Sequence, residues 1–416
     1  MYMCYVAGGG VSAPAPPTPK QSTPTLCSGS SCPFFIDSVV RYPSSYTYPA
    51  TYETRSLTPV TDYADGTSMF TPLDISATIS ADYKYEGGVL GPNGLIYLVP
   101  LNADNVGVLN PSTRNFTSIN GIYGDNGDWW KYEGGVLGPN GLIYFVPFNS
   151  HNIGVLDPTT DTFTTIDIKS TISRNRKYSG GVLGPNGLIY LVPHDANNIG
   201  VLDPSTDTFT TIDISTTISL GEKYVGGVLG PNGRIYFVPF FADVIGVLDP
   251  TTDTFTTIDI SATISTDRKY SGGVLGPNGL IYFVPYKTDI IVVLDPTADT
   301  FTTIDISTTI SSSADYRGGV LGPNGLVYFV ASDADNIGVL NPSTDTFSVI
   351  DISATISSNS KYMGGVLGPS GFIYLVPLNA DHIGMLELGN TEPAYEVAAG
   401  VPEAWSVLLS PHHNKF

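Results

Sequence analysis

Short apolar runs alternate with turn sequences along the middle of the chain. The run at 180–184 (GGVLG) leads to Asn186-Gly187, which suits a tight hairpin because both positions tolerate positive φ. Residues 188–192 (LIYLV) have the aromatic and β-branched content of a strand. Two further runs, 199–202 (IGVL) and 209–214 (FTTIDI), flank an Asp-Pro turn. The pattern predicts four short strands, and no stretch shows helical periodicity with caps.

This pattern repeats seven times. The string Tyr-x-Gly-Gly-Val-Leu-Gly-Pro-Asn/Ser-Gly recurs every 46 or 47 residues. Its tyrosines are Tyr85, Tyr132, Tyr178, Tyr224, Tyr270, Tyr316 and Tyr362. A period of this length is typical of propellers and solenoids, and four short strands per repeat match a propeller blade. We therefore expect an all-β fold, a seven-bladed β-propeller of four-stranded blades.

The two ends of the array indicate how the ring closes. The segment 69–80 (MFTPLDISATIS) matches the fourth-strand consensus but precedes the first complete repeat. The last repeat, 362–390, lacks a fourth strand, so the N-terminal strand is expected to complete it and remove two exposed sheet edges. Closure through 395–399 (YEVAA) is the alternative. The predicted organisation is an extended tail at 1–66, the propeller at 67–390 and a C-terminal tail at 391–416.

The repeat resembles the kelch-type β-propeller blade. The resemblance rests on an inner strand, a short Gly turn, an Ile-Tyr strand and then LDPTTDTF at 156–163 and 248–255, or LDPSTDTF at 202–209. The family's glycine pair ends the second strand, whereas here a Gly-Gly pair opens the first. The resemblance covers residues 69–390. It implies a propeller used mainly for protein recognition, in a family with a minority of enzymes.

Charge narrows the classes of function. The chain has 416 residues, with 18 Lys and Arg against 38 Asp and Glu, a net charge of −20. A field of that sign repels phosphate backbones, so we expect no nucleic-acid partner. No apolar run approaches the roughly 20 residues of a transmembrane helix, so no transmembrane segment is predicted.

The sequence nominates no catalytic residue, no metal site and no cofactor. The five histidines fall at unmatched positions: His151, His194, His382, His412 and His413. A phosphate-binding P-loop, a nucleophile elbow and paired CxxC spacing are all absent from the chain. We expect the protein not to be an enzyme.

A basic residue recurs just before the blade tyrosine. The six lysines are Lys84, Lys131, Lys177, Lys223, Lys269 and Lys361. The fourth strands carry an aspartate in six repeats, at Asp74, Asp167, Asp213, Asp259, Asp305 and Asp351. In the structural interpretation, carboxylates along the blade junctions form ion pairs with each lysine. The functional one is a basic ring at the inner rim that binds an anion or an acidic glycan.

Departures from the repeat nominate binding residues. The junction before the second repeat has one extra residue and contains Trp129 and Trp130, close to Asp125, Asn126 and Asp128. These residue types suit a sugar or a partner hot spot, although the rings could instead cover the seam of the ring. A second irregular patch is Phe240 and Phe241 with Tyr286 of the next repeat.

The flanks suggest a location. Residues 13–33 are dense in Pro, Ser and Thr, as in a stalk-like and O-glycosylated segment. Asn115 begins a usable N-glycosylation sequon. Cys27 and Cys32 could close a small loop, which would leave Cys4 for a bond to another chain. We expect an extracellular or cell-surface protein, although the given chain shows no clear signal peptide.

Together these features favour a non-enzymatic structural or interaction scaffold, a glycoprotein whose propeller is a rigid body. Its N-terminal tail would mediate tethering or self-assembly. The expected partners are other proteins or copies of the chain itself. A lectin-like glycan-binding propeller is the alternative, and a propeller lyase or hydrolase is a third possibility.

Overall fold

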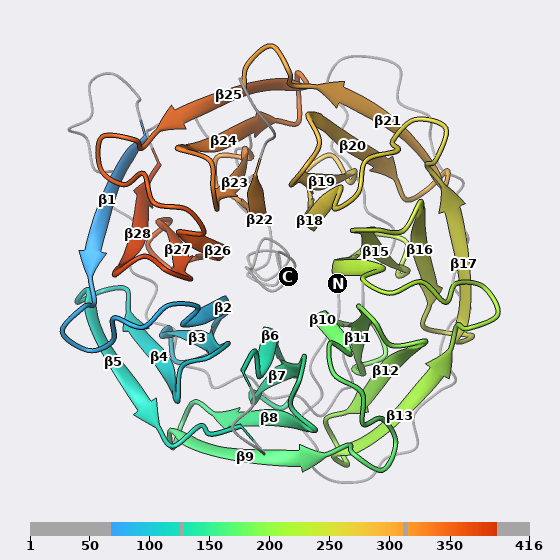
Figure 1. Ribbon diagram of the computed structural model, residues 1–416, viewed down its shortest axis with the longest axis horizontal. Coiled ribbons are helices and arrows are strands. Elements are labelled where there is room, and N and C mark those ends of the chain that lie inside the picture. The colour runs from blue at the N-terminus through green and yellow to red at the C-terminus, as the bar shows by residue number, and fades with distance from the viewer. Residues whose placement is uncertain (1–67, 125–128, 311–314, 389–416) are drawn as a thin grey trace, which may run out of the picture. The chain divides into compact units, whose positions relative to one another are not determined.

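Seven antiparallel sheets of four strands each surround a common axis (Figure 1). The computed structural model describes residues 68–124, 129–310 and 315–388. Blade 1 comprises β2 to β5, and blades 2 to 6 each take the next four strands. Blade 7 combines β26 to β28 with β1. The predicted seven-bladed all-β propeller is confirmed.

Each strand position in the blade repeats with nearly constant length. The innermost strands are β2 (Tyr85–Leu90), β6 (Tyr132–Leu137), β10 (Tyr178–Leu183), β14 (Tyr224–Leu229), β18 (Tyr270–Leu275), β22 (Tyr316–Leu321) and β26 (Tyr362–Leu367). The second strands are β3 (Ile96–Pro100), β7 (Ile143–Pro147), β11 (Ile189–Pro193), β15 (Ile235–Pro239), β19 (Ile281–Pro285), β23 (Val327–Ala331) and β27 (Ile373–Pro377).

The outer half of each blade is equally regular. The third strands are β4 (Asn105–Asn110), β8 (Asn152–Asp157), β12 (Asn198–Asp203), β16 (Val244–Asp249), β20 (Ile290–Asp295), β24 (Asn336–Asn341) and β28 (His382–Glu387). The outermost strands are β5 (Asn115–Asn120), β9 (Thr162–Asp167), β13 (Thr208–Asp213), β17 (Thr254–Asp259), β21 (Thr300–Asp305), β25 (Thr346–Asp351) and β1 (Met69–Asp74).

The ring closes as the ends of the array predict. Strand β1 pairs antiparallel with β28 over six residues and becomes the outermost strand of blade 7. Phe70 lies against Tyr362 in an edge-to-face contact, with ring centroids 6.3 Å apart. The equivalent Phe209 and Tyr178 of blade 3 are also 6.3 Å apart. Blade 7 is therefore packed like the others, although its strands come from opposite ends of the array.

The Gly-Gly pair that opens each innermost strand has two separate roles. Gly87 has φ of +76°, and a register shift separates Tyr85 from Gly88, so the first glycine forms a bulge that other residues would strain. A Cβ on Gly88 would come within 2.8 Å of Val366 in the neighbouring blade. The pair thus combines a backbone kink with close approach between blades.

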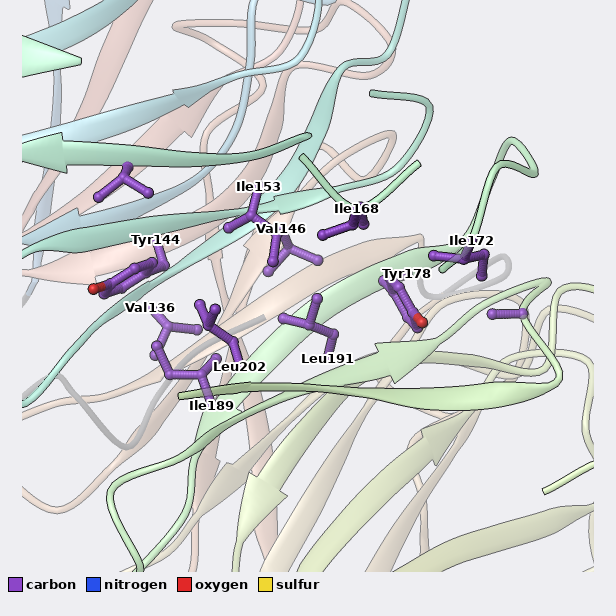
Figure 2. Close-up of a cluster of buried hydrophobic side chains, with 12 residues drawn as sticks. Val136, Tyr144, Val146, Ile153, Ile168, Ile172, Tyr178, Ile189, Leu191 and Leu202 are labelled. Atoms are coloured by element: carbon purple, nitrogen blue, oxygen red, sulfur yellow. The ribbon is translucent and has the colours of Figure 1, made fainter. Parts of the chain in front are cut away.

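Apolar side chains pack between neighbouring blades. Figure 2 shows one such cluster, in which Tyr144 and Val146 of blade 2 face Tyr178, Ile189 and Leu191 of blade 3. Equivalent clusters occur at the other junctions. The alternating apolar residues of every strand are therefore used to hold blade to blade.

One face of the ring repeats almost without change. We call it the repeating face: it contains the hairpins that join first to second strands and the turns that join third to outermost strands. In blade 3, Asn186 donates hydrogen bonds from Nδ2 to Tyr190 Oη (2.8 Å) and to the carbonyl of Pro250 in blade 4 (3.3 Å). The same pair of bonds recurs at Asn93, Asn140, Asn232 and Asn278. The hairpins of blades 1 to 5 therefore bind the next blade in the same way.

No helix among the described residues has the length and apolar character needed to cross a membrane.

Candidate functional site

The opposite face differs from blade to blade. We call it the divergent face: it contains the junctions between an outermost strand and the next innermost strand, and the loops between second and third strands. The six repeated lysines directly precede the innermost strands here, and all six are at least 98 % buried. Each ammonium group hydrogen-bonds a loop carbonyl of the preceding blade, as Lys131 does with Asn102 at 3.0 Å. The other five bonds follow the same pattern.

Four of these lysines also reach a loop carboxylate. The pairs are Lys84–Asp381 (3.6 Å), Lys131–Asp104 (3.4 Å), Lys269–Asp243 (2.9 Å) and Lys361–Asp335 (3.3 Å). Burial lowers the pKa of Lys223 to about 8, opposed by the charge of Asp195. Since the ammonium groups already bind carbonyls of the preceding blade, this geometry fits a structural role better than an exposed anion site.

The fourth-strand aspartates do not take part in these pairs, contrary to the repeated charge pair that the sequence suggested. Asp213 instead accepts a hydrogen bond from the backbone N–H of Ser215 at 2.8 Å. The other five aspartates bind the residue two positions ahead in the same way. The short side chain caps the turn that follows its own strand and therefore does not pair with a lysine.

Blade 6 reverses the charges. Asp315 occupies the lysine position, and Lys287 of the preceding loop forms an ion pair with it. The junction therefore keeps an inter-blade ion pair while exchanging the two partners. Blade 6 therefore departs from the repeat at Asp315 and, two residues later, at Arg317.

Two further positions of the divergent face change in chemistry from blade to blade. We call them the axial positions: the second residue of each innermost strand and the residue that follows each second strand. The first set is Glu86, Glu133, Ser179, Val225, Ser271, Arg317 and Met363. The second set is Leu101, Phe148, His194, Phe240, Tyr286, Ser332 and Leu378. The first set lies at the start of the innermost strands and the second set just after the second strands, so both belong to the divergent face. Figure 1 shows the innermost strands around the axis of the ring.

The axial side chains form a continuous aromatic arc across four blades. Phe148 and His194 lie 5.2 Å apart between ring centroids, and His194 and Phe240 lie 6.3 Å apart. Phe240 stacks on Tyr286 at 6.0 Å, and the Arg317 guanidinium lies 4.4 Å above the Tyr286 ring. Neighbouring blades therefore present their varied residues to one another.

Arg317 links this arc to the remaining blades. Its guanidinium donates one hydrogen bond to Tyr286 Oη at 2.7 Å and another to Met363 Sδ at 3.5 Å. Met363 packs with Leu101 and Leu378 in a small apolar cluster. The axial positions thus combine an aromatic side, an apolar side and a cationic group.

Two acidic groups stand opposite this cation. Glu86 and Glu133 are 2 % and 6 % exposed, on adjacent innermost strands. Burial, and then the charge of Glu133, raise the pKa of Glu86 well above its usual range, while Arg317 opposes the shift. Burial also raises the pKa of Glu133 to about 8, against a hydrogen bond from Ser179 and the charge of Arg317. Carboxyl groups this buried favour the neutral form.

A second charged group borders the aromatic arc. His194 Nδ1 and Asp195 Oδ1 are 3.1 Å apart, and Asp195 also accepts the backbone N–H of Glu222 at 2.7 Å. Burial alone would raise the pKa of Asp195, but these two hydrogen bonds and the nearby Arg176 lower it to about 2. Asp195 is therefore an anion at neutral pH that holds two blades together.

The tryptophan junction forms an exposed aromatic cluster. Trp129 and Tyr123 are each 72 % exposed, and Trp130 is 40 % exposed. Trp130 stacks on Tyr83 at 5.9 Å and lies 6.0 Å from Phe148, which connects the cluster to the aromatic arc. The junction residues Asp125, Asn126 and Asp128 lie outside the described residues.

The structure brings together most of the second patch as well. Phe240 stacks on Tyr286, whereas Phe241 packs beside Phe240 and lies under the Arg268 guanidinium.

Asn115 is exposed at the start of β5, so it remains a predicted glycosylation site. Cys4, Cys27 and Cys32 lie outside the described residues, as do His412 and His413. Among the described residues, no three His, Cys, Asp or Glu side chains gather in a metal-binding arrangement.

Sequence reasoning missed Glu86, Glu133 and Arg317. Each is the variable residue of the string Tyr-x-Gly-Gly, which we treated as a spacer within a constant motif. These residues could have been found in the sequence, because this position changes in chemistry from blade to blade while the tyrosine and glycine on either side stay constant.

No protein-family model matches the chain, and no curated protein matches it. Among solved structures, the chain resembles a catalytically inactive variant of virginiamycin B lyase from Staphylococcus aureus, crystallised with quinupristin. The two share 17 % identity at a TM-score of 0.64, over 77 % of this chain and all of that one.

Two further similar structures have other roles. Kuenenia stuttgartiensis hydrazine synthase matches at 12 % identity and a TM-score of 0.58, over 76 % of this chain and 98 % of that chain. An extracellular domain from B. thetaiotaomicron, described as part of a one-component system, matches at 11 % identity and 0.57, over 76 % and 42 %. At these identities the likeness shows the propeller fold alone.

Proposed function

We propose that the protein is a non-enzymatic interaction scaffold whose ring is a rigid body and whose divergent face binds other proteins or further copies of this chain. The observation that carries the proposal is the gathering of inter-blade differences on one face. A ring of equivalent blades needs no such differences for stability. A partner that spans several blades, however, meets a surface without seven-fold symmetry and can therefore bind in one orientation.

The backbone of the divergent face supports this proposal. The residue before each lysine has positive φ, yet the position holds Tyr83, Trp130, Arg176 and Glu222 in the first four blades. Glycine would adopt this conformation without strain, while other residues lose roughly 1–2 kcal/mol. Large side chains kept at a strained position point to a use outside the fold.

A face-specific set of substitutions tests the proposal. Blade 7 has Ser360 at the positive-φ position, so Tyr83→Ser, Trp130→Ser and Arg176→Ser introduce a residue that the fold accepts there. The control is Arg234→Leu with Phe372→Leu on the repeating face, where the other five blades have Leu. Sedimentation velocity and chemical cross-linking should show weaker self-association for the first protein only. Equal association of both proteins would contradict the proposal.

The proposal also assigns tethering or self-assembly to the tail at 1–66. Electron microscopy of the full chain and of a chain lacking residues 1–66, which keeps β1, tests this part. Ordered assemblies that need the tail would support it, and unchanged assembly without the tail would reject it. An extracellular location belongs to the same proposal, and the extracellular domain among the similar structures is consistent with it. The kelch-type resemblance likewise supports a recognition role.

Glycan binding is a second candidate function, favoured by the exposed aromatic cluster. Trp129, Trp130 and Tyr83 offer flat apolar surface, and the side chains of Asn102 and Asn149 bind the backbone of this junction. Aromatic rings with a polar border suit the apolar face of a sugar. A glycan array should lose signal with Trp129→Ala/Trp130→Ala but keep it with Leu220→Ala, an exposed apolar residue of the same face. Equal signals from wild type and the tryptophan variant would remove this site.

A further inference from the structure

The axial positions hold opposite charges that do not meet. Arg317 of blade 6 acts on the pKa values of both Glu86 and Glu133, which belong to blades 1 and 2. Within the described residues, no ion pair of 4 Å or less joins Arg317 to either glutamate. Arg317 and the two acids therefore interact electrostatically without forming an ion pair.

One polar group at the axial positions is buried without a protein partner. The Ser332 hydroxyl is fully buried and makes no hydrogen bond in the part of the chain that the structure describes. It holds the same blade position as Tyr286, which binds Arg317, and its backbone N–H donates to the carbonyl of Asp315 at 3.2 Å. Buried polar groups without partners are rare, because each carries its full desolvation penalty.

The remaining axial side chains supply an apolar wall. Phe148, Phe240 and Tyr286 line one side, and Leu101, Met363 and Leu378 pack together on the other. Phe240 and Arg317 are half-buried, so solvent reaches this part of the cluster. The chemistry is that of a small polar ligand with two opposite charges and one apolar group.

We infer that the axial positions bind a small zwitterion, an α-amino acid with an apolar or aromatic side chain. Arg317 binds its carboxylate, assisted by the Ser332 hydroxyl, because two of the five guanidinium N–H donors contact Tyr286 and Met363 and the others suit a carboxylate. Glu86 and Glu133 bind its ammonium group. The aromatic arc contacts its side chain. This inference goes beyond the proposed function, since its ligand is a small molecule at the axis and not a macromolecular partner.

A purely cationic or purely anionic ligand fits less well. A cation between the glutamates leaves the Arg317 charge unmatched, and an anion on Arg317 leaves the two glutamates without a cationic partner. A zwitterion matches both, and it favours the ionised carboxylates. Binding should therefore release protons from Glu86 and Glu133. Arg317 acts on both groups, and Ser179, Arg176 and Asp195 also act on Glu133.

The test is calorimetric titration of the full chain with each of the twenty common L-amino acids. The expected result is binding by a subset with apolar or aromatic side chains. Proton release should appear as a binding heat that depends on the ionisation enthalpy of the buffer. The N-acetyl form and the methyl ester of each binding amino acid should bind roughly 10- to 100-fold more weakly, because each lacks one charge.

The array supplies substitutions that its own blades accept. Arg317→Met copies blade 7, and Glu133→Ser copies blades 3 and 5. Each should weaken binding roughly 10- to 100-fold while circular dichroism and thermal unfolding show a folded ring. Leu220→Ala, an exposed apolar residue of the divergent face outside the axial positions, is the control and should keep binding within about threefold.

Three results would overturn the inference: no amino acid binds, the capped forms bind as well as the zwitterion, or Arg317→Met leaves affinity unchanged. Failure here would be distinct from failure of the proposed function. Self-association and the glycan array report on macromolecular partners, whereas the calorimetric titration reports only on the axial ligand.

Discussion

The two faces of this ring are built from the same strands but differ in what their sequences must satisfy. On the repeating face, Asn186, Tyr190 and the carbonyl of Pro250 make contacts that recur around the ring. On the divergent face, the lysines recur but the residues beside them change from blade to blade. The comparison shows that inter-blade attachment needs only a few fixed residues on each face. The rest of the divergent face is available for recognition.

The use of positive φ shows the same contrast. The hairpins of the repeating face place glycines such as Gly187 at this conformation, and its turns place aspartates such as Asp207 there. Both types tolerate it. The divergent face places Trp130 and Arg176 at an equally left-handed conformation. One face follows backbone preference, whereas the other overrides it.

The largest expected effect concerns the acidic pair of the divergent face. The double variant Glu86→Ser/Glu133→Ser replaces both buried acids by the residue of blades 3 and 5. Wild type binds more protons folded than unfolded between about pH 4.5 and the raised pKa values, so its free energy of unfolding falls as pH rises through this window. The variant lacks this loss. It should gain several kcal/mol relative to wild type between roughly pH 4.5 and pH 9.

Urea unfolding of both proteins at pH 5, 7 and 9 checks this prediction. The buried lysines titrate in both proteins, so their contribution cancels in the difference. A stability difference that stays constant with pH would mean that the two glutamates are ionised and solvated. Burial of Glu86 and Glu133 would then not lower the free energy of unfolding.

A pair of glycines compares the faces at smaller scale. A Cβ on Gly184, in a hairpin of the repeating face, would lie 2.7 Å from Tyr190 and 2.9 Å from Asn186. Gly184→Ala should therefore destabilise the ring by about 1–3 kcal/mol through overpacking. Gly221 lies on the divergent face, where the nearest atom to a Cβ would be 3.4 Å away. Gly221→Ala should be neutral or stabilising by up to about 1 kcal/mol.

Thermal unfolding of the two alanine variants measures this contrast directly. Equal losses at both positions would show that the divergent face is packed as strictly as the repeating one. The proposed freedom of the divergent face would then be wrong.

Periodicity was sufficient to predict the fold, because the repeat fixes strand number, blade number and closure. The 46-residue spacing and the lone strand at 69–80 led to the observed pairing of β1 with β28. The site was predicted only in part: Phe240 and Tyr286 do stack across blades. The partner of each lysine could not be read from the repeat. Asp104 and Asp74 both recur at equivalent positions of the repeat, and only the loop geometry brings Asp104 to a lysine.

The smallest expected effect concerns stability in the blade interior, where some blades lack the asparagine that accepts a hydrogen bond from the blade tyrosine. Tyr178 donates a hydrogen bond to Asn198 at 2.5 Å, but Tyr224 and Tyr270 are buried with unpaired hydroxyl groups, because Val244 and Ile290 replace the asparagine. Val244→Asn should supply the missing acceptor and stabilise the ring by about 1 kcal/mol. Asn198→Val is the reverse change and should cost about 1–3 kcal/mol, since it leaves Tyr178 unpaired. Chemical unfolding of both variants measures the two effects. If Val244→Asn destabilises the ring, the apolar residue fits its site better than an acceptor would, and blades 4 and 5 have adapted to their divergence.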